Sequence, residues 1–309
     1  MKIITLTLNP AFDVHCKADG FVPYHESVVE ITSREAGGKG VNISRALNAV
    51  ERENLALVVV GNENGDEFLK MLAADSLVCA PIVEKGRIRE NITLHEEHNP
   101  ETRISFGGFV PGSDILEKIE NAMGEIDENT VITLTGSNPK GIKAADVLEM
   151  LSSAKSRGAK IVIDSRSLTL AEITAFGPWL IKPNKDEMEK YVGKKINTVG
   201  DAARIAEALS RAGIENVMVS LGGDGAVLAT REGSFYAAVP PISAVSTIGA
   251  GDSSIAGFID AYCGGKAPDE CLRRAVSFGT AACMREGTKP PLREDITAIE
   301  SKVNIKRIV

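Results

Sequence analysis

Short runs of apolar, mostly β-branched residues alternate along this chain with longer amphipathic segments. Because the runs show no polar alternation, each is predicted to be a strand buried on both faces. The segments between them carry apolar residues at helical spacing. Strand–helix alternation of this kind predicts an α/β fold, in which a mostly parallel sheet is flanked by helices on both faces. The predicted buried strands are residues 3–8, 55–60, 131–134, 161–164, 179–182 and 217–221.

Composition and charge limit the classes of function. A net charge of −7, with no dense block of Lys and Arg, disfavours a general nucleic-acid binder. No apolar run approaches the roughly 20 residues that cross a bilayer. The five cysteines are scattered and never form a C-x-x-C pair, which is typical of reduced thiols in a cytoplasmic protein. The length of 309 residues suits one large domain or two ordinary ones.

Two segments interrupt the strand–helix alternation. Residues 12–32 and 87–107 show broken strand patterns with the turn dipeptides Asp19-Gly20 and Asn99-Pro100 and without a helical period. We interpret both as strands of a small β-sheet that projects from the main body. Such a small sheet is marginal alone, and packing on the main body or on a second copy would stabilise it.

The strongest chemical signal is the stretch Val245-Ser-Thr-Ile-Gly-Ala-Gly-Asp252, which leads into a predicted helix over residues 253–263. A glycine-rich turn at a helix start presents unpaired backbone N–H groups and the positive end of the helix dipole. This arrangement binds anions, and Asp252 beside it can accept a proton from a hydroxyl. Phosphoryl transfer to an alcohol requires these two elements together.

Two further motifs follow predicted strands near the start of the chain. In Asn9-Pro-Ala-Phe-Asp13, Asp13 would accept hydrogen bonds from sugar hydroxyls or simply cap a turn. In Ala36-Gly-Gly-Lys-Gly-Val-Asn42, before a predicted helix over residues 43–50, Lys39 and Asn42 offer a charge and an amide to a ligand. The alternative is a plain glycine-rich helix entry, and the spacing does not match a P-loop.

Two motifs of the second half carry weaker signals. Asn184 and Glu187, three residues apart, would hold Mg²⁺ directly or through water, or would cap a helix. The stretch Ser220-Leu-Gly-Gly-Asp-Gly225 would line nucleotide phosphates or form a tight turn. Neither this stretch nor the Gly249 turn has the G-x-G-x-x-G spacing, which disfavours a nicotinamide-dependent dehydrogenase.

In this order, the five motifs resemble those of the PfkB carbohydrate kinases, and the resemblance runs over essentially the whole chain. It implies a ribokinase-like fold formed by residues 1–309 as one domain, with a β-sheet lid from about 12–32 and 87–107. The likeness is greatest to members that phosphorylate fructose 1-phosphate, with those acting on tagatose 6-phosphate next. It implies transfer from ATP with Mg²⁺ to a sugar phosphate, and a homodimer formed through the lid. A non-catalytic sugar-phosphate-binding protein on the same fold is the alternative from another class.

The resemblance also implies a role for individual residues. Asp252 would be the base, and the backbone of Gly249, Ala250 and Gly251 would stabilise the transferring phosphoryl group. Asn184 and Glu187 would hold Mg²⁺ through water. The nucleotide-binding residues would be Lys182, Asn184, Glu187, Ser220, Gly222 and Gly225. The sugar-phosphate-binding residues would be Asp13, Gly38, Lys39, Asn42, Arg89, Asn91 and Arg103, with Lys39, Arg89 and Arg103 assigned to the existing phosphate.

One turn departs from the family pattern. The sequence Thr135-Gly-Ser-Asn-Pro-Lys-Gly141 carries Asn138 where leucine is usual in the family. Polar Asn138 and Lys140 at a strand end are expected to alter contacts with the substrate.

Overall fold

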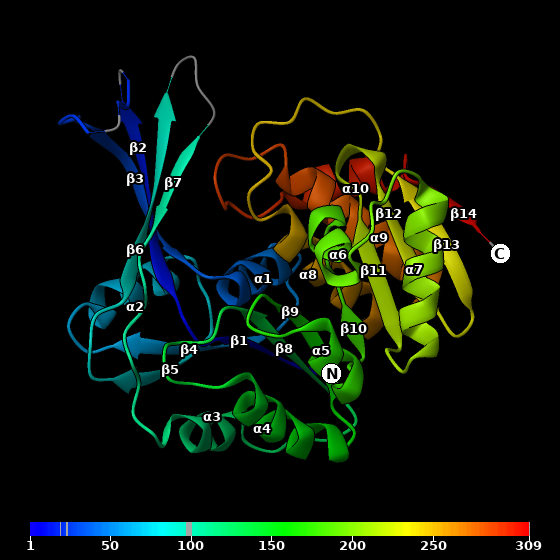
Figure 1. Ribbon diagram of the computed structural model, residues 1–309, viewed down its shortest axis with the longest axis horizontal. Coiled ribbons are helices and arrows are strands. Elements are labelled where there is room, and N and C mark those ends of the chain that lie inside the picture. Colours follow the sequence, from blue (N-terminus) through cyan, green and yellow to red (C-terminus); the bar gives the residue numbers. More distant parts are fainter. Residues whose placement is uncertain (19, 23, 97–100, 309) are drawn as a thin grey trace.

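Two β-sheets organise the computed structural model, which describes residues 1–18, 20–22, 24–96 and 101–308 (Figure 1). Within these residues the larger sheet has 10 strands. The strands from β5 across to β11 are parallel to their neighbours, and those from β11 to β14 are antiparallel. The predicted mostly parallel sheet is therefore confirmed. Across the sheet, the strands are β14 (Asn304–Arg307), β13 (Gly233–Ala238), β12 (Ala226–Thr230), β11 (Asn216–Ser220), β10 (Leu180–Ile181), β9 (Lys160–Ser165), β8 (Thr130–Gly136), β1 (Lys2–Thr7), β4 (Leu55–Gly61) and β5 (Cys79–Glu84).

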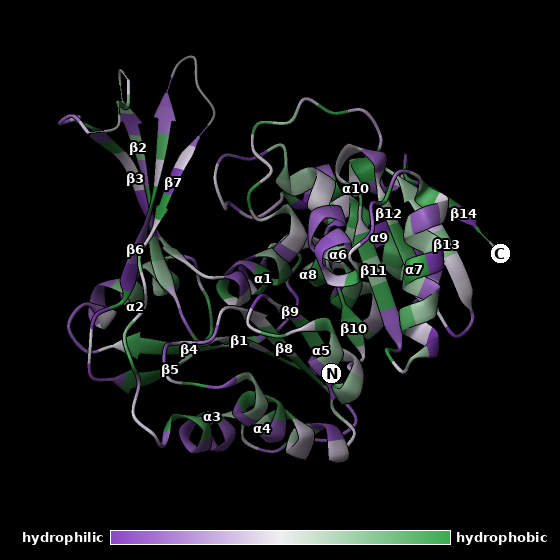
Figure 2. Cartoon of the chain, in the orientation of Figure 1, coloured by the Kyte–Doolittle hydropathy of each residue, from purple (hydrophilic) through white to green (hydrophobic). Residues whose placement is uncertain are grey.

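Helices cover both faces of this sheet, as predicted. Alternate residues of β1 point to opposite faces, so that Ile4 and Leu6 belong to one apolar core and Ile3 to another. The core that contains Ile4 is closed by α3 (Ile115–Met123), α4 (Ala144–Ser156), α5 (Leu170–Phe176), α6 (Lys185–Val192) and α7 (Val199–Arg211). The core that contains Ile3 is closed by α1 (Lys39–Asn48), α8 (Ala250–Cys263), α9 (Pro268–Ala282) and α10 (Arg293–Glu300). Figure 2 shows the apolar strands between these layers.

The smaller sheet, called the lid below, extends away from the main body (Figure 1). Its strands, in order, are β3 (Glu30–Gly37), β2 (Ala11–Ala18), β6 (Arg89–Glu96) and β7 (Thr102–Ser105). The base of the lid packs with α2 (Gly65–Ala74) around a third apolar core that includes Phe12 and Phe68. The two predicted lid segments are thus both strand-forming. Asp19 and the Asn99-Pro100 turn lie outside the described residues.

Several predicted boundaries are wrong by a few residues. The return strand β3 continues to Gly37, five residues beyond the predicted segment. The helices α1 and α8 begin four and three residues earlier than predicted, because a glycine with positive φ precedes each of them and turns the chain directly into helix. Strand β10 is only two residues long, since Pro178 and Pro183 flank it and proline cannot donate to a sheet.

The described residues contain no helix with the length and apolar character that a membrane crossing needs. All five cysteines are free thiols, in agreement with the sequence prediction.

Candidate active site

A cavity of about 630 Å³ opens at the carboxyl ends of the parallel strands, between them and the lid. We call it the active-site cavity. Its walls come from β1, β8 and β9, from the first turns of α1 and α8, and from lid strands β2, β6 and β7. Ligands of open parallel sheets bind at this edge. The predicted residues that line it are Asp13, Gly38, Lys39, Asn42, Arg89, Asn91, Arg103, Lys182, Asn184, Glu187, Gly249, Gly251 and Asp252.

The start of α8 forms one wall of the cavity. Gly249 has a φ of 76° and ends the preceding loop, so that the first N–H groups of α8 have no carbonyl within the helix to bind. A Cβ added at Gly251 would lie 2.9 Å from Nζ of Lys182, which shows how closely this ammonium approaches the turn. The turn therefore combines helix-start N–H groups with a buried lysine, and it suits an anion.

Asp252 lies in the first turn of the same helix and is 6% exposed. Burial raises the pKa of Asp252 to about 6, although the nearby charge of Lys39 opposes the effect. Asn42 donates from Nδ2 to Oδ2 of Asp252 over 2.9 Å. A carboxylate with a pKa near neutrality is well suited to accept a proton during catalysis.

Lys39 contacts a second buried carboxylate in the cavity. Its Nζ lies 2.9 Å from Oδ2 of Asp164, which is 8% exposed. Burial alone would raise the pKa of Asp164, but the charges of Lys182 and Lys39 outweigh it and the pKa is lowered. Burial likewise would lower the pKa of Lys39, but Asp164 and Asp252 raise it. Lys39 and Asp164 thus form a charged pair.

Asp13 and Asn91 form the lid side of the cavity. Asn91 donates from Nδ2 to Oδ1 of Asp13 over 3.0 Å, and burial raises the pKa of Asp13. The Oδ1 atom of Asn91 is buried and has no hydrogen-bond partner among the described residues. A carboxylate and an open amide oxygen side by side are acceptors for the hydroxyl groups of a polyol.

Arg89 and Arg103 differ in how free their guanidinium groups are. Arg89 donates to the carbonyls of Phe106 and Asn9, and its Nε is buried without a partner among the described residues. Burial lowers the pKa of Arg89. Arg103 is 54% exposed and pairs with Glu101 at 2.9 Å. Of the three residues predicted to bind the phosphate of the sugar, Arg103 and Lys39 therefore already have acidic partners, whereas Arg89 donates to backbone carbonyls.

Asn184 and Glu187 form a helix cap at the start of α6, which is the alternative to Mg²⁺ binding that the sequence left open for these two residues. Asn184 accepts from the backbone of Glu187 over 2.8 Å, and Glu187 accepts from the backbone of Asn184 over 3.1 Å. Both residues also line the cavity. Two hard oxygen groups fit Mg²⁺ that keeps most of its waters. No cluster of three or more acidic, His or Cys side chains suited to a metal occurs among the described residues.

Some predicted residues lie outside this cavity. Ala250 is the first residue of α8 and does not line it. Ser220 ends β11, and Gly222 and Gly225 lie in the turn between β11 and β12, where Gly222–Asp224 is a single 3-10 turn. This turn adjoins the cavity wall, because Ser220 pairs with Asn184 in a β-bridge.

Asn138 does not line the cavity, although its neighbour Ser137 does. The backbone N–H of Asn138 donates to Oγ of Ser167 over 2.8 Å, and its Oδ1 is buried without a described partner. Asn138 therefore makes no direct contact with the cavity, and the expected change of substrate contacts at this residue stays a prediction.

Sequence reasoning missed Asp164, Arg166 and Thr288 in the wall of this cavity. The sequence pattern places Asp164 only at the end of a predicted buried strand. A polar residue at the carboxyl end of a parallel strand is itself a signal for a site, and it would have identified Asp164.

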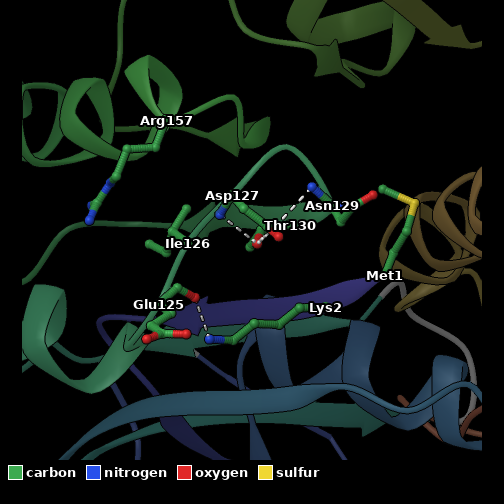
Figure 3. Close-up of a pocket in the computed structure, with 8 residues that line it drawn as sticks. All are labelled: Met1, Lys2, Glu125, Ile126, Asp127, Asn129, Thr130 and Arg157. Atoms are coloured by element: carbon green, nitrogen blue, oxygen red, sulfur yellow. Dashed lines mark hydrogen bonds between the residues drawn. The ribbon is translucent and has the colours of Figure 1, made fainter.

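A second hollow, of about 710 Å³, lies at the opposite edge of the sheet, at the amino ends of β1 and β8 (Figure 3). Its polar groups bind neighbouring parts of the chain. Lys2 donates to the carbonyls of Met123 and Glu125, and Thr130 donates to Asp127 over 2.9 Å. This hollow lacks the buried, shifted carboxylates of the active-site cavity.

Comparisons with known proteins agree with this geometry. The chain is 28% identical to the 1-phosphofructokinase of Escherichia coli K12, over 99% of this chain and 98% of that protein. It is 30% identical to the 1-phosphofructokinase of Bacillus subtilis 168, over 92% and 93% of the two chains. The crystal structure of phosphofructokinase-2 from Escherichia coli in complex with substrates and products matches with a TM-score of 0.91 and 26% identity, over 98% of this chain and 99% of that one.

The fold and the cavity therefore define the class of the protein as a sugar kinase with a ribokinase-like fold. The family model of the pfkB carbohydrate kinases matches residues 11–295. The chain belongs to this family.

Proposed function

We propose that the protein transfers the terminal phosphoryl group of ATP to a hydroxyl of a ketohexose phosphate, with fructose 1-phosphate as the preferred acceptor and fructose 1,6-bisphosphate as the product. The observation that carries the proposal is the position of Asp252. Its buried carboxylate stands at the anion-binding start of α8, in one cavity with the polyol acceptors Asp13 and Asn91.

The chemistry assigned to Asp252 is general-base catalysis. The acceptor hydroxyl oxygen forms a bond to the terminal phosphorus as the bond to the leaving ADP oxygen breaks. The hydroxyl proton goes to a carboxylate oxygen of Asp252. The N–H groups that begin α8, with Lys182 against Gly251, stabilise the charge on the transferring group.

The remaining cavity residues bind and orient the two ligands. Asp13 and Asn91 accept hydrogen bonds from the sugar hydroxyls, and Arg89 binds the phosphate already on the sugar. Asn184 and Glu187 hold Mg²⁺ through water, and the ion supplies positive charge to the phosphates of ATP. The turn Ser220–Gly225 extends the nucleotide site beyond the cavity wall. Lys39 is assigned to the reacting phosphoryl group as well as to the sugar phosphate, since it pairs with Asp164 close to Asp252.

The choice of fructose 1-phosphate follows the names of the relatives, which share 28% and 30% identity with this chain. A panel of fructose 1-phosphate, fructose 6-phosphate, tagatose 6-phosphate and fructose tests it, with ADP release as the measurement. The highest kcat/KM is expected for fructose 1-phosphate. A higher value for either 6-phosphate would overturn the substrate while leaving a kinase. Binding of sugar phosphate without ADP release would indicate the non-catalytic alternative.

The lid is assigned a second role as a dimer contact. Paired residues of neighbouring strands share a face, so Asp13, Asn91 and Arg103 face the cavity side, and Ile104 lies on the opposite face. Exposed apolar side chains of the lid and its loops are available to a second copy: Val22, Tyr24, Val28, Ile31, Ile104 and Phe106. A cytoplasmic location agrees with the free thiols.

A further inference from the structure

A buried arginine outside the cavity wall is connected to the proposed base. Arg45 lies in α1, three residues after Asn42, and is 8% exposed. Its Nε and one terminal nitrogen each lie 2.7 Å from Oδ2 of Asp75. Its other terminal nitrogen donates to Oδ1 of Asn42 over 3.4 Å. The guanidinium is thus held by Asp75 on one side and contacts the Asn42 amide on the other.

The amide of Asn42 has two chemically different ends. Its Oδ1 end faces the guanidinium, and its Nδ2 end donates to Oδ2 of Asp252 over 2.9 Å. An amide oxygen only accepts and an amide nitrogen only donates. In the reverse orientation the nitrogen would face the donors of Arg45, and the oxygen would face a carboxylate. The guanidinium of Arg45 and the carboxylate of Asp252 therefore both favour the orientation in which Asn42 donates to Asp252.

We propose that Arg45 is a positioning residue of the phosphoryl transfer: by holding Oδ1 of Asn42, it keeps Nδ2 of Asn42 directed at the carboxylate of Asp252. This inference rests on the proposed function, in which Asp252 is the base. Arg45 itself contacts neither ligand in this role. Asp75 fixes the guanidinium from the side remote from the cavity.

The proposal has a consequence for the proton affinity of Asp252. A hydrogen bond donated to a carboxylate favours its charged form. The hydrogen bond from Asn42 accordingly lowers the pKa of Asp252, against the effect of burial. The other charged groups that act on Asp252 are Lys39, Lys182 and Asp164, whereas the side-chain contacts of Arg45 are with Asp75 and Asn42. Loss of Arg45 is thus expected to raise the pKa of Asp252.

Arg45 also acts on a second carboxylate, which the test must separate. Burial raises the pKa of Asp13, and the charge of Arg45 opposes this effect, together with the hydrogen bond from Asn91 and the charges of His15 and Arg89. Because Asp13 is assigned to sugar binding, its change appears in KM for the sugar phosphate. Profiles of kcat at saturating ATP and sugar phosphate report Asp252 instead.

The test compares Arg45→Met with Arg52→Met as a matched control. Arg52 makes a similar ion pair, with Nε 2.7 Å from buried Asp260, at the turn that follows α1 and outside the cavity. In the pH profile of kcat, we expect the acid limb of Arg45→Met to move to higher pH by about half a unit or more. The acid limb of Arg52→Met should not move. An acid limb that does not move in a folded Arg45→Met protein would overturn the proposal. An arginine with only a structural role would lower the stability of the protein and leave the pH profile unchanged.

Two further variants keep the proposal testable if Arg45→Met fails to fold. Arg45→Lys retains a donor and a charge, so it is expected to shift the limb less than Arg45→Met. Some shift is still expected, because lysine cannot reach both partners as the planar guanidinium does. In an Asn42→Ala background, Arg45→Lys should shift the limb no further. An additional shift in that background would contradict action through Asn42.

A readout without turnover separates this inference from the proposed function. Carboxyl ¹³C NMR titration, with Asp252 assigned by its absence in Asp252→Asn, gives the pKa of Asp252 in each variant. A raised value in the Arg45 variants supports the inference. An unchanged value rejects it, even where Asp252→Asn is inactive as expected. An active Asp252→Asn protein would instead reject the proposed base, whatever the Arg45 variants show.

Discussion

Nζ of Lys39 lies 2.9 Å from Oδ2 of Asp164, and the charge of the same ammonium acts on Asp252. One cation therefore serves two buried carboxylates with opposite properties. The pKa of Asp164 is lowered, whereas that of Asp252 is raised to about 6. The pair keeps Lys39 charged beside the proposed base.

Replacing Lys39 by methionine should therefore raise the pKa of Asp252. Lys39 is the largest favourable charge near this carboxylate, so its loss leaves burial and the repulsion of Asp164 less opposed. The acid limb of kcat is expected to move to higher pH, and kcat at neutral pH to fall. Steady-state rates of ADP release between about pH 5 and 9 measure both effects.

Lys118→Met is the matched control for Lys39→Met. Lys118 pairs at 2.7 Å with Glu84, a carboxylate as buried as Asp164, but the pair lies outside the active-site cavity. This control should leave the acid limb unchanged. An equal shift in both variants would indicate a general effect of lost charge and not a local action on Asp252.

Asp252→Asn should make the protein less active and more stable. Loss of a general base typically costs about 10² to 10⁴ in rate, while nucleotide binding is expected to survive. Asp252 is stabilising only in its protonated form: its contribution is full below the ordinary pKa of 3.8 and is lost as the pH rises through about 6. The amide removes this buried charge, and at pH 8 it should add on the order of 3 kcal/mol to the free energy of unfolding.

Thermal unfolding at two pH values tests the stability effect of Asp252→Asn. The gain in melting temperature should be clear above pH 6, and it should shrink as the pH falls toward 4, where the carboxylate of the native protein is protonated. A variant that is less stable than the native protein at pH 8 would refute the assignment of Asp252 as a destabilised buried carboxylate.

Gly37→Ala should impair sugar binding specifically. A Cβ at Gly37 would lie 2.0 Å from Oδ2 of Asp13, so the carboxylate must move from its present position. We expect KM for the sugar phosphate to rise about tenfold or more, with KM for ATP little changed, because a displaced ligand contact costs binding at that ligand alone. Gly20→Ala is the control in the same lid, since a Cβ there meets nothing within 4 Å. Similar KM values for the two variants would separate Asp13 from sugar binding.

The sequence predicts the sheet well because its signal is local. Buried runs such as residues 161–164 can be predicted as strands without knowledge of their partners. The rule that ligands of parallel sheets bind at the carboxyl ends of the strands then locates the cavity. The contacts within the cavity are not local. Asn42 and Asp252 meet across 210 positions of the chain, and Lys39 and Asp164 across 125.

The orientation of Asn42 illustrates the limit most clearly. The motif predicts that Asn42 contacts a ligand, but only the structure shows that Asn42 donates to Asp252 and that Arg45 contacts its other end. Arg45 in the sequence reads as an ordinary charge on an amphipathic helix. Conversely, the first turn of α6 confirms the helix cap formed by Asn184 and Glu187, and both residues line the cavity, whereas their role toward Mg²⁺ stays a prediction.

The lid dimer predicts that charge on the outer face of the lid abolishes association. Ile104 pairs with Ile92, which pairs with Val14, so these three side chains share the face opposite Asp13. Ile31, paired with Cys16, adds a side chain that is 63% exposed. The double variant Ile31→Asp and Ile104→Asp should sediment as a monomer, whereas the native protein should sediment as a dimer in analytical ultracentrifugation.

Val78→Asp is the control for this substitution. Val78 is as exposed as Ile31, at 66%, but it precedes the edge strand β5 of the large sheet. Added charge there should leave the dimer intact. A native protein that is monomeric at the concentrations used for kinetics would rule out the lid dimer. Because the lid also carries Asp13 and Asn91, a monomeric variant is further expected to show a raised KM for the sugar phosphate, as the marginal sheet loses the packing that stabilises it.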